Sequence, residues 1–252
     1  MDICIWHLGS GEGYAVLYSS NTTVTYTGTP KTGNVSANVT YTNTSTPASD
    51  GWNLIGNPYP SDLNSSSFLS DNANVSALYF WSDDNSSGTG YNRTNDYAVI
   101  NSSGSTAASG GGDTTTPYSV PVGQGFFVQV SSAGTVSFTN SMRRGSHTQF
   151  FNSDAETLKP RRAWLSLNDG DGNSNMILVA FVMGATDNKD WQYDALKLSG
   201  NPDISFYSIL QEEQLVIQGL SPSSKRRRIP IGYFSGIGGD MEISLINSQN
   251  LL

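Results

Sequence analysis

The sequence is poor in the residues that carry most enzyme chemistry. Among 252 residues it has one cysteine, Cys4, and two histidines, His7 and His147. A single cysteine excludes a disulfide within the chain. The patterns G-x-S-x-G, H-E-x-x-H and G-x-x-x-x-G-K-[ST] are absent. We therefore predict that the chain has no catalytic residues, needs no cofactor and is not an enzyme. A carboxylate pair for glycoside hydrolysis is the alternative that a sequence leaves open, because its geometry is not visible there.

Charged residues are also scarce. They make up 13% of the chain, and the formal net charge is −8. Before residue 143 the only basic residues are Lys31 and Arg93. An acidic surface repels nucleic acid and anionic lipid. A membrane-spanning helix needs about 20 consecutive apolar residues, and no apolar run in this sequence is nearly that long. We predict neither a nucleic-acid partner nor membrane insertion, and we interpret the basic run at 225–228 as a solvated turn.

Sustained helical periodicity is missing, and short alternating segments take its place. Ser, Thr, Asn and Gly separate them, as they do between strands of all-β proteins. The expected strands include 35–43, 52–55, 77–81, 96–100, 118–130 and the segments from 205 onward, with a hairpin at 163–182 around an Asp/Gly turn. We predict an all-β fold of two tandem antiparallel β-sandwich modules, jelly-roll-like, at 1–145 and 158–252.

One sequence segment occurs twice, in similar form, 112 positions apart. GEGYAVLYSSNTTVTYT at 11–27 matches GQGFFVQVSSAGTVSFT at 123–139 without a gap. Alternation on both sides of a polar turn predicts the same β-hairpin in both places. Because only ten residues precede the first copy, we hypothesise that the chain belongs to a longer protein. The first module would then be incomplete at its start and the second at its end, and a diverged module with fewer strands is the alternative.

Several motifs in order carry a resemblance to a known family. They are GWNLIGNPYPSDLN (51–64), ALYFWSDD (77–84), NDYAVIN (95–101) and PVGQGFFVQVSSAGTVSFTNSMR (121–143). Together they resemble a module of large secreted Bacteroidetes proteins, the cargo of the type IX secretion system, where it precedes a C-terminal sorting domain. Residues 161–198 resemble the companion β-domain, including D-A-x-K-L at 194–198.

The resemblance has implications for location and partners. It implies an extracellular or cell-surface protein whose partners are the adjoining domains of a larger parent. It carries over no catalytic residue. A signal peptide and a sorting domain are absent from this sequence, so the inference of secretion depends on flanking segments.

Aromatic side chains are the candidate ligand-binding residues. Tyr91, in a Gly/Asn/Ser-rich loop, and the two tryptophans Trp81 and Trp52 could stack on the sugar rings of an extracellular polysaccharide. The alternative for Trp52 and Trp81 is core filling, which we favour because both lie in apolar runs. For Tyr91 an ordinary loop position is the alternative.

Alternate oxygen-bearing residues suggest a metal site in the 168–175 turn. Asp169, Asp171, Asn173 and Asn175 follow one another at every second position, as in part of a calcium-binding loop. The final bidentate glutamate of such a loop is missing. The alternative is an ordinary hairpin turn, in which Asp, Asn and Gly are common.

From these observations we predict a non-catalytic structural or adhesive β-sandwich segment of a secreted, cell-surface bacterial protein exported by type IX secretion. Two alternatives stay open. One is a carbohydrate-binding accessory module of a secreted polysaccharide-degrading enzyme, and the other is a calcium-stabilised adhesin.

Overall fold

A computed structural model describes residues 9–15, 23, 25–44, 49–82, 96–108, 118–144, 160–201, 203–222 and 227–251. Within these ranges the chain forms seventeen strands, one α-helix of seven residues, α1 (Ser65–Asp71), and a 3₁₀ turn, η2 (Asn140–Met142). Strand pairing is antiparallel throughout, except that β12 runs parallel to β15. The prediction of an all-β fold is confirmed.

The first part of the chain forms one main sheet and two small ones. The five-stranded sheet, called the central sheet below, has the order β2 (Trp52–Gly56), β8 (Gly125–Val130), β4 (Val75–Ser82), β5 (Asp96–Asn101), β6 (Gly104–Thr106). The small sheets are β1 (Val35–Val39) with β9 (Gly134–Phe138), and β10 (Arg143–Arg144), β3 (Asp62–Asn64), β7 (Ser119–Val120).

The last part of the chain forms a seven-stranded sheet, called the large sheet. Its order is β16 (Ile231–Ser235), β14 (Ile204–Leu210), β15 (Glu213–Leu220), β12 (Ser174–Phe181), β11 (Arg161–Asn168), β17 (Glu242–Gln249), with β13 (Ala195–Leu196) also on β15. The hairpin predicted at 163–182 is confirmed, because β11 and β12 pair from Arg161↔Phe181 to Asn168↔Ser174.

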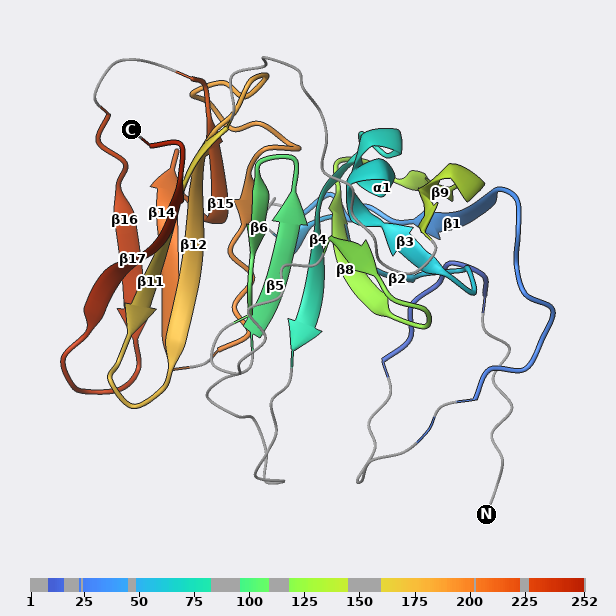
Figure 1. The fold of residues 1–252 in the computed structure, drawn as a ribbon, viewed down its shortest axis with the longest axis horizontal. Coiled ribbons are helices and arrows are strands. Elements are labelled where there is room, and N and C mark those ends of the chain that lie inside the picture. The colour runs from blue at the N-terminus through green and yellow to red at the C-terminus, as the bar shows by residue number, and fades with distance from the viewer. Residues whose placement is uncertain are drawn as a thin grey trace.

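The sheets stack in layers, with the central sheet in the middle (Figure 1). One of its faces packs against β1, β9, β3 and α1 and forms an apolar core. Ile55, Phe126 and Phe68 are at most 1% exposed there. Alternation of side chains along a strand places such residues on one face and leaves the other face free to meet another layer.

The opposite face of the central sheet packs against the large sheet. A second core cluster combines Ala77, Tyr79 and Val99 of the central sheet with residues of the large sheet such as Leu178 and Ile217. No strand of residues 9–144 pairs with a strand of 160–251 among those described. The strands of the two parts are paired separately, but the two parts share a core. Independent folding of two modules stays a prediction.

The hairpin prediction is wrong for the second copy of the duplicated segment. In the second copy, β8 pairs with β2 and β4, whereas β9 pairs with β1 in a different sheet. The apolar residues before and after the 131–133 turn belong to two different layers. The chain therefore passes from one sheet to another at this turn. In the first copy, residues 16–22 and 24 lie outside the described residues, and Glu12 forms only an isolated bridge to Ile55.

The first residues of the two copies of the segment nevertheless lie on opposite sides of the same strand, β2. Glu12 bridges Ile55 of β2 from one side, and Phe126 pairs with Ile55 from the other. Gly13 lies so close that an added Cβ would be 2.7 Å from the Ile55 carbonyl oxygen. This approach explains a glycine at that position.

Candidate functional site

The contact between the central sheet and the large sheet, called the joint, buries polar groups as well as apolar side chains. Its apolar part includes Tyr79, Leu178 and Ala180, all fully buried. Glycines let the layers approach. A Cβ added to Gly104 of β6 would lie 2.7 Å from Leu178, and one added to Gly219 of β15 would lie 2.4 Å from the Ser103 hydroxyl.

A buried ion pair crosses the joint. Lys197 Nζ lies 3.0 Å from Asp96 Oδ2, and the two side chains are only 3% and 4% exposed. Asn175 also donates from Nδ2 to Asp96 Oδ2 at 2.6 Å, and its Oδ1 accepts from the Phe206 backbone at 3.0 Å. Because a buried charge is costly without a partner, these groups are tied to one relative position of the layers.

The segment Asp194-Ala195-Leu196-Lys197-Leu198 supplies much of the joint. Lys197 makes the ion pair, and the Leu196 carbonyl accepts a 3.0 Å bond from the Tyr79 hydroxyl of β4. Asp194 accepts from the backbone nitrogens of Asp190 at 2.7 Å and Gly219 at 2.9 Å. Burial raises the pKa of Asp194 to about 6, against the lowering effect of these bonds. This motif therefore has a structural role.

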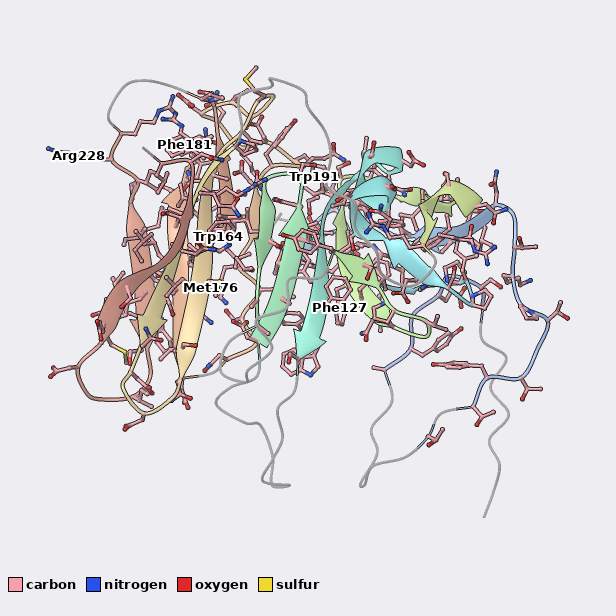
Figure 2. All side chains as sticks on the ribbon, viewed as in Figure 1. Phe127, Trp164, Met176, Phe181, Trp191 and Arg228 are labelled. Atoms are coloured by element: carbon pink, nitrogen blue, oxygen red, sulfur yellow. The ribbon has the colours of Figure 1, made fainter. Side chains whose placement is uncertain are left out.

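Further side chains cross the joint to backbone carbonyls. Trp164 donates from Nε1 to the Ser105 carbonyl at 2.8 Å, and Trp191 donates to the Asn74 carbonyl at 3.0 Å. Arg162 donates from Nε to the Ser103 carbonyl at 2.7 Å. Burial lowers the pKa of Arg162. Figure 2 shows Trp164 between the large sheet and the central sheet, and Trp191 at the upper end of the central sheet. Directional bonds of this kind fix orientation as well as distance.

An aromatic row borders the joint on the same face of the central sheet. It consists of Trp52, Tyr79, Trp81, Tyr97 and Phe127. Neighbouring ring centroids are 4.8–6.4 Å apart, mostly edge to face. Tyr79 is buried, Trp52, Tyr97 and Phe127 are half-buried, and Trp81 is 39% exposed.

The positions of these rings bear on the prediction that Tyr91, Trp81 and Trp52 bind a sugar. The structure brings Trp81 and Trp52 into one cluster. Core filling is the wrong interpretation for Trp81, which is 39% exposed near the end of β4, whereas Trp52 packs partly against the joint. Tyr91 lies outside the described residues. Sequence reasoning missed Tyr97 and Phe127, although period-two alternation in 96–100 and 125–130 could have placed both rings on one face.

Of the four predicted calcium ligands, Asn175 lies apart from the turn that holds Asp169, Asp171 and Asn173. Asp169 Oδ1 accepts from the backbone nitrogens of Asp171 at 2.9 Å and Asn173 at 3.0 Å, and the Asn173 amide donates to its other oxygen. Although slight burial opposes the effect, these bonds lower the pKa of Asp169. Asn175 is fully buried and bonds to Asp96 instead. Calcium binding by Asp169, Asp171 and Asn173 stays a prediction.

Among the residues that the structure describes, no three His, Cys, Asp or Glu side chains gather as metal ligands would. In the same part of the chain, no helix has the length and hydropathy to cross a bilayer. Cys4, His7 and His147 lie outside the described residues.

Comparison with protein families matches residues 7–252 to a family described as a domain of unknown function, DUF8693. The chain belongs to this family. The match runs through both halves of the fold and the joint between them. No curated protein and no solved structure matches the chain.

Proposed function

We propose that the chain is a rigid, non-catalytic β unit that spaces and presents other domains of a larger bacterial surface protein. The joint is the observation that carries this proposal. A spacer must hold its layers at a fixed angle, and the buried pair of Lys197 with Asp96 supports one arrangement of the two sheets. Tyr79, Trp164 and Trp191 add directional bonds across the same contact.

The proposed location follows the resemblance to type IX secretion cargo. We expect the parent protein outside the cell or on its surface. Antibody raised against the purified chain should label intact cells of the native organism. Labelling that requires cell lysis would contradict the proposed location.

Rigidity is tested by distances between labels in the two parts. Spin labels at Thr40→Cys and Ser244→Cys, in a Cys4→Ser background, report the separation of the first and last layers. We expect one narrow distance distribution. A broad distribution would show that the sheets move relative to each other and would remove the basis for a spacer. Two labels within the large sheet, at the exposed Gln214→Cys of β15 and at Ser244→Cys of β17, serve as the control for label flexibility.

The aromatic row supports a second candidate, a carbohydrate-binding accessory module. Flat, partly exposed rings beside one another suit stacking on sugar rings. Trp81, 39% exposed, would be the main contact, with Tyr97 at 4.9 Å from it holding the indole in place.

A glycan array followed by calorimetric titration tests this candidate. Binding that Trp81→Ala abolishes would support it. Tyr26→Ala is the control, because Tyr26 is 62% exposed and lies beside Gly123, away from the row. Absence of binding across plant, algal and microbial polysaccharides would exclude the candidate, as would equal loss in both variants.

A further inference from the structure

Strand β16, at the outer edge of the large sheet, has an unusual surface. It pairs only with β14, and its other edge has no partner among the described strands. Ile231, Tyr233 and Phe234 are 39%, 54% and 55% exposed. Natural edge strands commonly carry a charge or a bulge that blocks further pairing. Residues 231–235 carry no charge, and their pairing with β14 is regular.

The opposite edge of the sheet differs. Strand β17 shifts register against β11 between Trp164 and Leu165, which marks a bulge. A bulge twists a strand and interrupts the row of backbone groups that a new strand would need. Among the described strands of the large sheet, β16 therefore offers the regular edge.

We propose that β16 pairs with β16 of a second copy of this chain, antiparallel, about a two-fold axis at Tyr233. A two-fold axis between antiparallel strands places one residue opposite itself. With Tyr233 at the axis, Gly232 lies opposite the partner's Phe234 and Ile231 opposite the partner's Ser235. The two large sheets then form one continuous sheet.

Gly232 lies in the middle of this edge and pairs with Tyr207 within the sheet. A Cβ on Gly232 would lie 2.6 Å from the ring of Tyr207, so this ring covers the glycine and leaves no room for a side chain there. In the proposed register the partner's Phe234 lies opposite Gly232 and would pack beside the Tyr207 ring.

The charges that flank β16 favour a second copy as the partner. Arg228 precedes the strand and Asp240 follows it, and neither has a hydrogen bond or ion pair with another described residue. Figure 2 shows Arg228 pointing away from the body. In an antiparallel pair the start of one strand lies beside the end of the other. Each Arg228 would therefore approach the turn that carries the partner's Asp240, and no like charges would meet.

Cysteine cross-linking tests the axis. In a Cys4→Ser background, Tyr233→Cys places two thiols opposite each other, whereas Phe234→Cys places its thiol opposite glycine. The two native side chains are almost equally exposed, 54% and 55%, so they form a matched pair. We expect a disulfide-linked dimer with Tyr233→Cys at least tenfold faster than with Phe234→Cys. Equal rates would overturn the proposed register.

Charge exchange tests the partner. Sedimentation should show a concentration-dependent dimer of the unmodified chain. Arg228→Glu and Asp240→Arg should each weaken it, and the double variant should restore it because the charges are exchanged together. Tyr233→Lys should abolish it by placing two ammonium groups opposite each other. A monomer at every concentration, a dimer that tolerates Tyr233→Lys, or a double variant weaker than both single ones would each overturn the proposal.

Discussion

On one face of the central sheet the contacts are almost wholly apolar, whereas on the other face buried charges and hydrogen bonds cross to the next layer. The apolar face packs Ile55, Phe126 and Phe138 against the small sheets and α1. The polar face carries the Lys197–Asp96 pair at the joint. Apolar packing stabilises but is non-directional, while bonds at the joint specify one orientation. The same sheet thus serves as a core on one side and as an oriented interface on the other.

The largest expected effect is on the apolar face. Phe126→Ala removes a ring that is 1% exposed and stacks near Phe80 and Phe68. We expect a loss of about 3–5 kcal/mol in the free energy of unfolding, measured by urea titration, because a cavity remains. A loss below that of Tyr26→Ala, an exposed position, would contradict the assigned core.

The next effect tests the ion pair of the joint. Lys197→Met leaves Asp96 buried without its cation, and we expect a loss of roughly 3 kcal/mol in unfolding free energy. Adding Asp96→Leu should recover most of it, because replacing both partners removes the buried charge. The control is Lys189→Met, whose pair with Glu213 is about 30% exposed and should be worth less than about 1 kcal/mol. Equal losses from the two lysine variants would contradict a special role for the joint.

A smaller effect tests the close approach of the layers. Gly219→Ala would place Cβ 2.4 Å from the Ser103 hydroxyl and 2.8 Å from the Tyr193 carbonyl oxygen. Because backbone must move, we expect a loss of about 2 kcal/mol by urea titration. Gly238→Ala, with no atom within 4 Å of the added Cβ, should change stability by less than about 0.5 kcal/mol. Indistinguishable variants would mean that the layers are not tightly packed there.

The smallest effect concerns pH. The pKa of Asp194 is raised to about 6 by burial, above about 3.9 in the unfolded chain. The folded state therefore holds this proton more tightly, so the contribution is greatest below pH 4 and is lost as pH rises to about 6. We expect the stability of the unmodified chain relative to Asp194→Asn, measured by calorimetry, to fall by about 1 kcal/mol between about pH 5 and about pH 6. A constant or rising difference would show that the carboxyl is not buried as described.

The sequence patterns predicted the kind of fold better than its connections. Short apolar runs at 52–55 and 77–81 located β2 and β4, and the Asp/Gly turn located the hairpin of β11 and β12. Alternation in 123–139 could not show that β8 and β9 enter different sheets. A hairpin turn and a turn between two sheets have similar local sequences.

For the candidate site, the spacing of residues in the sequence predicted a wrong partner in one case and predicted no partner in another. Asn175 has the spacing of a calcium ligand, but alternation turns its side chain into the sheet toward Asp96. The pair of Asp96 with Lys197 joins residues 101 positions apart, and nothing in either local sequence specifies that contact. Long-range packing decides such partners, so they require coordinates.

The central claim is that the central and large sheets form one structural body through the joint. Differential scanning calorimetry of the intact chain tests it most directly. The account predicts a single transition whose calorimetric and van't Hoff enthalpies agree, because neither sheet can lose the joint and keep its buried charges paired. Two separate transitions, one for each half of the chain, would contradict it.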